Sequence, residues 1–402
     1  MSVIKRTSCV LLAIVFAASA FAGFAIAEEE LEQTPAKWSV LVYLVADNNL
    51  DDYIQTDLDE LMTVGTGDDV NVLTIVDGLY TPANLYRVDL GEMVLLEEYG
   101  ELNMGDPSVL RSFIDYSNKH YPAEHMCLFF WDHGSGVSGV GYDETMEDGS
   151  AGGDWLTHQE LMGALDGLKV DVMAMDECSI GQIETIYEYA AKGVDTDYIV
   201  ASESYIGWRG FSYDKILERL AADPEMDSEE LSLVIVDEFT KLFSVSPFMS
   251  EILTTQTVFK LSEITDAANA MNVLASMLAA DIGQYKSAIN IAEADSRTPW
   301  GSRSAGRIDL PTFLESIQKH VPAKSPVYAG CQLVLDELSD VIKGMGVTPI
   351  SEKLGYQGVG ILFPPSYSMY TVASAASYDM YMKFEFPHNG WWDFLEKYWG
   401  VA

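Results

Sequence analysis

The stretch from Val170 to Ser179 constrains the fold of this chain most strongly. It reads VDVMAMDECS, a short and largely apolar run followed by two acidic residues and Cys178. A helical pattern follows at once, with apolar residues at i, i+3 and i+4 spacing: Ile180, Ile183, Ile186, Tyr187 and Ala190. An apolar run bounded in this way is typical of a buried strand in a parallel sheet. The pattern therefore predicts a strand that ends at a thiol, with a helix beginning at residue 180.

A second apolar run, Met126–Trp131, ends just before His133 in a glycine-rich turn. Parallel strands end at the same edge of a sheet, so His133 and Cys178 can meet there. A cysteine nucleophile needs such a base nearby, and the backbone N–H groups of a glycine-rich turn can line an oxyanion site. From spacing alone, a buried structural cysteine and a loop histidine without a catalytic role fit slightly better, and the glycine-rich turn narrows that difference.

Strand and helix patterns alternate along the first half of the chain. The predicted strands are 38–46, 69–77, 125–131, 170–176 and 197–202, with a hairpin over 85–98. The predicted helices are 53–64, 107–120, 157–168 and 180–192, and residues 132–155 form a long glycine-rich loop. This order predicts an α/β fold with a mostly parallel central sheet and helices on both of its faces.

Beyond Asp223 the patterns become mainly helical. They cover 228–243, 263–294, 311–343 and an aromatic-rich end at 391–399, with short strands near 255–260 and 358–363. We therefore expect a core over 38–222. The helix-rich region 223–402 should pack on that core and extend its sheet.

The net charge of the chain limits the classes of partner that it can bind. It has 62 acidic and 23 basic residues, which gives a net charge of −39. Such an excess argues against nucleic acid and anionic membranes, and it favours cationic substrates and divalent ions. A solvated acidic coat would explain the same charge without any partner.

Residues 1–27 have the pattern of a secretory signal peptide. Lys5 and Arg6 precede an apolar run, and Ala25-Ile26-Ala27 offers a cleavage site. A retained membrane anchor is the alternative, because the run is long. We expect cleavage after Ala27, a flexible leader over 28–37, and a secreted chain without a further membrane span.

Without residues 1–27 the chain keeps three cysteines, Cys127, Cys178 and Cys331. An odd number does not suit a disulfide framework. Cys127 lies in an apolar strand pattern and Cys331 in an amphipathic helical pattern, so both are expected in the core. Cys178 is the one at a strand-to-helix junction.

The ordered set of motifs resembles the clostripain family of cysteine peptidases, relatives of caspases, legumains and gingipains. The resemblance rests first on Asp132–Gly136 (DHGSG) and Asp171–Cys178 (DVMAMDEC). It extends from about Trp38 to Tyr398 through further matches: YLVADNNL at 43–50, Glu184, Ala201-Ser202-Glu203, GVGILFP at 358–364, and residues 392–398.

The resemblance implies a caspase-like three-layer sandwich and a Cys–His dyad. His133 would be the general base and acid, Cys178 the nucleophile, and the N–H groups of Gly134 and Cys178 the oxyanion hole. The family cuts peptides and proteins after Arg or Lys, and the matching carboxylate here is that of Asp176. Glu203 would be a second acid in the same S1 pocket. Asp176 could instead be a plain turn residue at a strand end.

The resemblance also implies that calcium could be needed, as it is for some family members. A cluster near residue 50 could hold it, or could simply cap a helix: Asp47, Asn48, Asn49, Asp51 and Asp52. A second acidic group lacks EF-hand spacing: Asp143, Glu144, Glu147 and Asp148. The metal ligands therefore stay unassigned.

Two other functions fit parts of the sequence. One is a catalytically inactive, secreted binding module that uses its acidic face to hold cations or basic peptides. The other is a metal-dependent hydrolase built on Asp132 and His133. That reading needs a second histidine ligand, and His125 and His158 lie in separate strand and helix patterns.

Overall fold

The computed structural model describes residues 34–145, 149, 151–245, 248–296, 306–368 and 375–401. The expected signal peptide over 1–27 and most of the expected leader over 28–37 lie outside these residues, as do Glu147 and Asp148. Residues Pro35–Ala402 form one compact unit.

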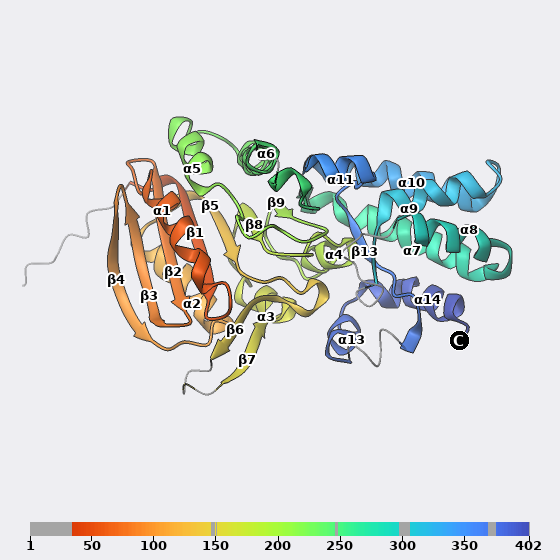
Figure 1. The fold of residues 1–402 in the computed structure, drawn as a ribbon, viewed down its shortest axis with the longest axis horizontal. Coiled ribbons are helices and arrows are strands. Elements are labelled where there is room, and N and C mark those ends of the chain that lie inside the picture. The colour runs from red at the N-terminus through yellow and green to blue at the C-terminus, as the bar shows by residue number, and fades with distance from the viewer. Residues whose placement is uncertain are drawn as a thin grey trace, which may run out of the picture. The chain divides into compact units, whose positions relative to one another are not determined.

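One nine-stranded sheet occupies the centre of this unit, in the order β12-β10-β9-β8-β5-β1-β2-β3-β4 (Figure 1). Five neighbouring strands are parallel: β2 (Val70–Gly78), β1 (Ala36–Ala46), β5 (Ala123–Trp131), β8 (Val172–Asp176) and β9 (Tyr198–Ala201). Antiparallel strands flank them: β3 (Thr81–Asp89) and β4 (Glu92–Gly100) on one side, β10 (Thr255–Lys260) and β12 (Ile342–Val347) on the other. The expected mostly parallel sheet is therefore confirmed.

Each face of the sheet carries its own hydrophobic core. Side chains alternate along β1, so that Leu41, Tyr43 and Val45 enter one core and Val40, Val42 and Leu44 the other. The first core packs against α2 (Pro107–His120), α3 (His158–Ala164), α4 (Ile183–Ala191), α7 (Ile264–Ala280), α8 (Ile282–Asp295), α9 (Leu310–His320), α10 (Pro326–Val341) and α14 (Trp391–Trp399). The second packs against α1 (Ile54–Met62), α5 (Tyr213–Ala222) and α6 (Ser228–Val245). This is the expected three-layer sandwich.

The structure corrects several predicted boundaries. The expected loop 132–155 contains a hairpin of β6 (Val140–Thr145) and β7 (Ala151–Leu156). Three of its glycines, Gly141, Gly152 and Gly153, lie within these two strands. The helix expected at 180 begins at Ile183, and the pattern 263–294 is two helices that separate at Asp281. The pattern 311–343 likewise splits into α9 and α10, because Pro326 begins a new helix there.

The remaining elements are short. β13 (Gly360–Leu362), predicted near 358–363, pairs with β11 (Arg307–Asp309) in a separate two-stranded sheet. Patterns in the sequence did not indicate β12, α5, α11 (Pro349–Leu354) or α13 (Ala375–Tyr381). Single turns of 3-10 helix are η1 (Asp51–Tyr53), η2 (Gly136–Ser138), η3 (Met249–Glu251), η4 (Leu261–Glu263) and η5 (Phe386–Asn389).

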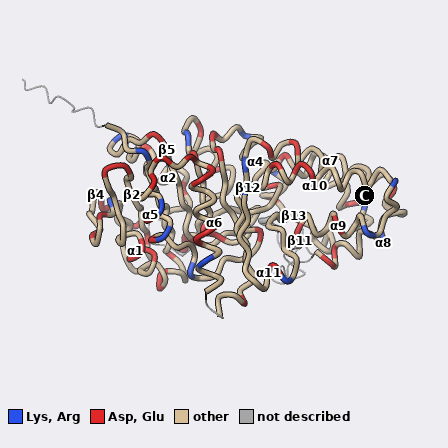
Figure 2. Tube along the Cα trace, turned by 90° about the horizontal axis from the view of Figure 1, so that it is seen from above, with Lys and Arg blue, Asp and Glu red and all other residues tan. Residues whose placement is uncertain are grey.

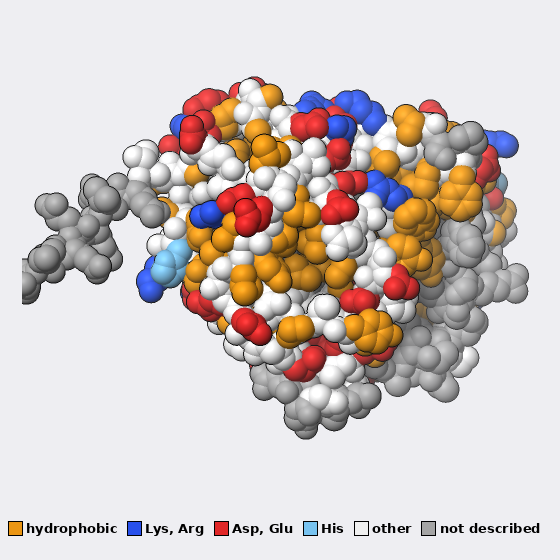
Figure 3. Space-filling view, turned by 60° about the vertical axis from the view of Figure 1, so that its left-hand side comes forward, with side chains coloured by type: hydrophobic (Ala, Val, Ile, Leu, Met, Phe, Trp, Pro, Cys, Tyr) orange, Lys and Arg blue, Asp and Glu red, His pale blue; other side chains and the backbone are white. Residues whose placement is uncertain are grey.

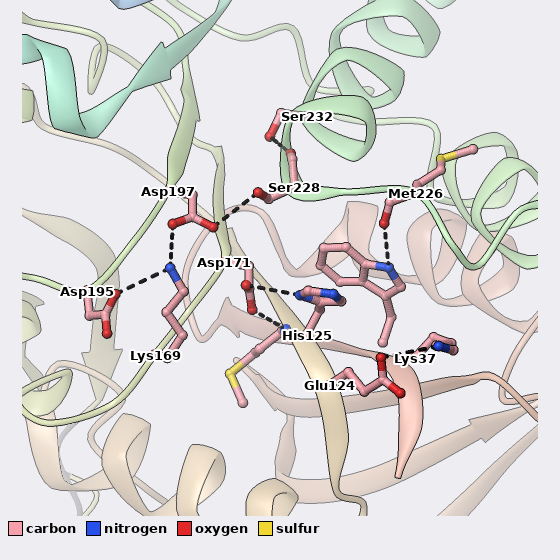
Figure 4. A network of polar contacts seen from close by, with 12 residues as sticks. Lys37, Glu124, His125, Lys169, Asp171, Asp195, Asp197, Met226, Ser228 and Ser232 are labelled. Atoms are coloured by element: carbon pink, nitrogen blue, oxygen red, sulfur yellow. Dashed lines mark hydrogen bonds and ion pairs between the residues drawn. The ribbon is translucent and has the colours of Figure 1, made fainter.

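Polar contacts fix the amino ends of the central strands (Figure 4). The carboxylate of Asp171 accepts a hydrogen bond from the backbone N–H of Met126 at 2.8 Å and contacts Nδ1 of His125 at 3.1 Å. The ammonium of Lys169 pairs with Asp195 and Asp197 at 3.3 and 2.5 Å. These contacts hold β5, β8 and β9 in register, so that their other ends meet at the opposite edge.

Acidic residues are spread along the whole trace rather than gathered in one segment (Figure 2). On the face drawn in Figure 3, hydrophobic side chains gather in the middle and acidic side chains lie around them. Within the described ranges, every helix is too short or too polar to cross a lipid bilayer.

Candidate active site

A pocket of about 290 Å³ opens at the carboxyl ends of β5 and β8. Four segments that are far apart in the sequence line it: Leu50 with Tyr53, residues 131–134, residues 176–178, and residues 205–208 with Gly210. The carboxyl-end edge of an open α/β sheet is where such folds place their ligand sites. His133, Gly134, Asp176 and Cys178 therefore line one pocket, whereas Glu203 is not among its lining residues.

His133 lies against the turn that follows β1. Its Nε2 is 3.0 Å from Oδ1 of Asn49, and Asn48 holds that turn by donating from Nδ2 to Oδ1 of Asp132 at 2.8 Å. Burial lowers the pKa of His133 below its usual 6.5, with the nearby Glu144 carboxylate opposing the shift. The imidazole is therefore neutral at pH 7 and can accept a proton.

Cys178 lies in a tight turn between β8 and α4. Ser179 has φ of 65°, the one positive φ outside glycine among the described residues, and its N–H donates to the carbonyl of Ser204 at 2.7 Å. Non-glycine residues held at positive φ cluster at functional sites. The Sγ atom of Cys178 accepts a hydrogen bond from the N–H of Ile206 at 3.3 Å.

Burial raises the pKa of the Cys178 thiol to about 11. The N–H of Ile206 and the charge of Arg307 oppose this shift, whereas the carboxylates of Glu177 and Asp176 reinforce it. Because α4 begins five residues after the cysteine, the expected help from a helix N-terminus is weaker than the sequence indicated. The thiol and the imidazole are thus both neutral in the absence of substrate.

Gly134 brings the histidine turn against the cysteine turn. A Cβ atom at Gly134 would collide with the carbonyl oxygen of Cys178 and lie 2.9 Å from its amide nitrogen. Only glycine allows this approach of the two backbones. The backbone at Gly134 and the amide of Cys178 therefore lie side by side, as the resemblance implies for an oxyanion hole.

Asp176 is a buried residue among those that line the pocket. Its Oδ2 accepts hydrogen bonds from the N–H of Phe211 at 2.9 Å and from the Tyr213 hydroxyl at 3.1 Å. Gly210, at φ of 54°, has no side chain to cover this carboxylate. Burial raises the pKa of Asp176 to about 7, and the negative charge of Glu60 adds to the shift. A cationic group that entered the pocket would find an acidic partner there.

Aromatic rings form the wall of the pocket. Trp208 is 52 % and Tyr205 is 44 % exposed, and the ring of Trp208 lies 5.6 Å from that of Tyr53 between centroids. Exposed aromatic rings are common in binding surfaces and can contact the stem of a long cationic side chain. The lining of the pocket thus combines exposed aromatic rings with a buried carboxylate.

Glu203 lies elsewhere. It is buried, its Oε1 accepts a hydrogen bond from the N–H of Gly358 at 2.9 Å, and it interacts with the carboxyl group of Asp309. These contacts join β9 to the segment before β13. The structure therefore does not bring Glu203 to Asp176, although the strand end was predicted correctly.

The residues considered for a metal have separate roles. Asn48 and Asn49 contact Asp132 and His133, and Asp47 instead lies near Glu101 and Asp143, with their carboxylate oxygens within 4.8 Å of one another. The histidines needed for a metal-dependent hydrolase are not nearby. His158 is buried against Tyr189 and the carbonyl of Gly136, and His125 contacts Asp171 at the amino end of the strands.

Sequence patterns did not single out several residues around the pocket. Asn49 was noted as part of an acidic cluster, not as a partner of His133. Arg307 donates to the carbonyl of Ser135 at 3.2 Å and lowers the pKa of Cys178 by its charge. The segment Tyr205–Gly210 lies between β9 and α5, and it carries the exposed rings of Tyr205 and Trp208.

Comparison with known proteins identifies the family and the fold of the chain. The model of the clostripain family matches residues 42–391. Clostripain from Hathewaya histolytica is 28% identical over 232 residues, which are 48% of this chain and 44% of that protein. The chain thus aligns with less than half the length of that relative.

Two solved structures have a similar fold. One is an inactive zymogen C11 protease from Parabacteroides distasonis, with 19% identity, a TM-score of 0.66, and coverage of 89% of this chain and 99% of that one. The other is a secreted C11 cysteine protease from Bacteroides thetaiotaomicron in complex with an irreversible peptide inhibitor, with 19% identity, a TM-score of 0.63, and coverage of 86% and 99%. At these identities the likeness concerns the fold, and it confirms the expected caspase-like sandwich. Because the family model matches most of its residues, from the middle of β1 to the first residue of α14, this chain belongs to the clostripain family.

Proposed function

We propose that this chain is a secreted cysteine endopeptidase that hydrolyses peptide bonds after Arg or Lys. One observation carries the proposal: His133, Cys178 and Asp176 line the same pocket, from two segments that lie far apart in the sequence. A base, a thiol and a buried carboxylate are the groups that such a reaction needs at one place. Membership of the clostripain family supports the same activity.

In this mechanism Cys178 attacks the carbonyl carbon of the bond to be cut. The imidazole of His133 takes the thiol proton as the C–S bond forms, and the N–H groups of Gly134 and Cys178 hold the oxyanion. His133 then gives the proton to the departing amine, which leaves a thioester. Water, deprotonated by His133, attacks the thioester and releases the acid and the thiol.

The protonation states suit this sequence of steps. Burial raises the pKa of Cys178 and lowers that of His133, so the resting pair is thiol and neutral imidazole. The proton therefore moves during the attack itself and does not rest on the imidazole beforehand. Ile206 supports the developing thiolate, because its N–H already donates to Sγ.

Asp176 gives the specificity in this proposal. A P1 guanidinium or ammonium would pass along Trp208 and Tyr205 and pair with the carboxylate below Gly210. Bidentate pairing is available to Arg and not to Lys. We expect substrates to be peptides or proteins with exposed basic residues, which the acidic surface also attracts.

A covalent probe distinguishes this enzyme from an inactive binding module on the same fold. An arginyl or lysyl chloromethyl ketone should label Cys178 in an active enzyme, whereas an aspartyl analogue should not. A module without the activity would bind basic peptides but leave the thiol unlabelled. Mass spectrometry of the labelled peptide locates the modified residue.

We expect Asn49 to position His133. If Nε2–H donates to Oδ1 of Asn49, the lone pair of Nδ1 is free to act as the base. Asn49→Ala should lower kcat about tenfold with little change in KM. Asn49→Asp keeps an acceptor, and its charge should move the acid limb of the kcat profile to higher pH. Asp52→Asn, in the same turn, is the matched control; equal losses in both variants would show that only the turn matters.

We also expect the active protein to stay uncut between His133 and Cys178. Lys169 is the only basic residue in that segment. Its side chain pairs with Asp195 and Asp197, and the next residue, Val170, donates to the carbonyl of Asp195 at 3.0 Å. Cleavage after Lys169 would require local unfolding of this edge. Intact-mass measurement of the active protein and of Cys178→Ala checks this: a cut seen only in the active protein would contradict the expectation.

A further inference from the structure

The two-stranded sheet of β11 and β13 lies against the cysteine turn, residues 177–182. β13 is beside α4, the helix that follows this turn (Figure 1). The N–H of Gly360 donates to the carbonyl of Gly181 at 2.9 Å, and the N–H of Leu362 donates to Oε1 of Glu184 at 2.7 Å. β13 is therefore attached to both the turn and the helix that follow β8.

Gln182 completes this attachment. Its Nε2 donates to the carbonyl oxygens of Ser179 at 3.2 Å and Glu203 at 2.9 Å. A Cβ atom at Gly360 would collide with the Gln182 side chain, so β13 approaches the turn as closely as a glycine backbone allows. The cysteine turn is thus held by β13 on one side and by the segment after β9 on the other.

β11 contacts the histidine turn, residues 132–136, through one side chain. Arg307 lies in β11, and its Nη2 donates to the carbonyl of Ser135 at 3.2 Å. The guanidinium also lies against Gly136, where a Cβ atom would collide with it. Gly136 has φ of 60°, so its conformation and its neighbour both require glycine. One small sheet from the C-terminal region therefore contacts both turns.

The charge of Arg307 acts on two groups of the cysteine turn and its helix. It lowers the pKa of the Cys178 thiol and the pKa of the buried Glu184 carboxyl group. Oε2 of Glu184 is buried without a hydrogen-bond donor, and a cation nearby offsets the cost of burying that carboxylate. The guanidinium is thus close enough to both groups to favour their charged forms.

The pocket itself supplies no such cation. The titratable groups that line it with Cys178 come from four segments: Tyr53, Asp132 and His133, Asp176 and Glu177, and Tyr205. Among them, Asp176 and Glu177 raise the pKa of the thiol. No Lys or Arg is found among the described residues of this lining. A positive charge that favours the thiolate therefore comes from outside the pocket, where Arg307 lies.

We propose that Arg307 is a positioning residue for the pair of Cys178 and His133: it holds the histidine turn beside the cysteine turn, and its charge favours the thiolate. The inference rests on the proposed function, in which these two residues react together. Arg307 acts through the two turns, because it is not among the residues that line the pocket. The C-terminal region would then be part of the active site and not only a support for the core.

Alkylation of Cys178 by iodoacetamide tests the charge effect without any need for peptidase activity. The full chain is treated at about pH 9, and mass spectrometry of the peptides locates the modified cysteine. Only the thiolate reacts, so the rate reports the ionised fraction. Arg307→Gln should slow the alkylation about threefold or more, because the loss of a nearby positive charge raises the pKa of the thiol. Arg307→Lys keeps the charge, and its rate should stay within about twofold of the wild type.

Hydrolysis of an arginyl peptide tests the positioning effect. Arg307→Gln should lower kcat about tenfold with little change in KM, because the histidine turn loses a contact outside the pocket. Arg87→Gln is the matched control. Arg87 is a partly buried arginine of β3 that pairs with Asp89 at 2.7 Å, and its replacement removes the same charge. That variant should keep the alkylation rate and kcat within about twofold of the wild type.

Gly136→Ala disturbs the same contact from the histidine turn. Its Cβ atom would displace the guanidinium, so this variant should slow alkylation as Arg307→Gln does, and the double variant should lose little more than either single one. Gly167→Ala is the control for backbone strain, because Gly167 has φ of 71° but open space around its Cβ position. This pair of variants tests the inference even if Arg307→Gln does not fold.

The outcomes distinguish this inference from the proposed function. Slower alkylation in Arg307→Gln and Gly136→Ala, with a normal rate in Arg307→Lys and both controls, supports the role of Arg307. An unchanged alkylation rate in Arg307→Gln would overturn it, and so would an equal fall in Arg87→Gln. A wild-type protein that shows the alkylation differences but cuts no peptide would overturn the proposed function and leave the effect of Arg307 on the thiol in place.

Discussion

Cys178→Ala and His133→Ala are each expected to lower kcat/KM for an arginyl peptide by about 10⁴-fold or more. The thiol supplies the bond-forming atom and the imidazole supplies the proton acceptor, so neither step proceeds without the other. The double variant should therefore lose little beyond either single variant. Steady-state hydrolysis of a fluorogenic arginyl substrate measures all three proteins.

Cys127→Ala is the control for the thiol. Cys127 is fully buried in β5, and burial raises its pKa well above the usual value. Its replacement should lower Tm through a small cavity but leave kcat within about twofold. Circular dichroism shows whether each variant keeps the fold. If Cys178→Ala folded normally and kept substantial activity, the nucleophile would be misassigned.

Asp176→Asn is expected to lower kcat/KM for arginyl and lysyl substrates by at least about tenfold. The reason is that the Asp176 carboxylate is buried, so its pairing with a P1 cation is weakly screened by water. A substrate with a neutral P1 residue of similar size should change little. A wild-type enzyme that preferred acidic P1 residues would rule out this role.

The same residue predicts a pH dependence. Burial raises the pKa of Asp176 to about 7, so in the free enzyme the group is increasingly protonated below that pH. Only the ionised carboxylate attracts a P1 cation, and kcat/KM for arginyl substrates should therefore rise with pH through about 7. In Asp176→Asn, this rise of kcat/KM should be absent. Only the rise caused by deprotonation of His133 should remain, and the pKa of His133 is lower than usual. Profiles of kcat/KM for both proteins test the assignment.

Asp171→Asn provides a matched control for burial. Asp171 precedes β8, whose last residue is Asp176, and its carboxylate is nearly buried and accepts a backbone hydrogen bond. The variant is expected to be less stable, because the N–H of Met126 loses a charged acceptor. Its P1 preference and pH profile should be unchanged, because it lies at the far edge of the sheet. A shift of either would point to a general effect of losing a buried acid.

Local patterns in the sequence were sufficient to predict most elements of the fold. Apolar runs of five to nine residues predict buried strands well, and the helix expected from residue 157 begins as α3 just after its N-cap, Thr157, which forms a capping box with Glu160. Strands with weak apolar patterns were not predicted. β12 contains Gly344 and Gly346, which pack against α6 and resemble turn residues in the sequence. The same applies to β6 and β7, where glycine-rich composition concealed a hairpin.

The site was predictable only in part, for a physical reason. His133, Cys178 and Asp176 follow or end strands, and strand ends in a parallel sheet meet by topology. Asn49 contacts His133 because Asn48 anchors the turn to which both asparagines belong. Glu203 also follows a strand end, but its carboxylate contacts Gly358. Strand order does not determine where a side chain beyond the strand points. Those positions depend on contacts that only the folded chain shows.

The burial of Cys178 has a consequence for the lifetime of the protein. Peroxide and other oxidants react with a thiolate far faster than with a thiol. Because burial raises the pKa of this thiol to about 11, almost none of it is ionised at neutral pH. If the chain is secreted as proposed, the sulfur would thus resist sulfenic acid formation in oxidising surroundings while no substrate is bound. Burial thus slows the reaction of the Cys178 thiol with oxidants, and we expect the thiol to become reactive only when a peptide is bound.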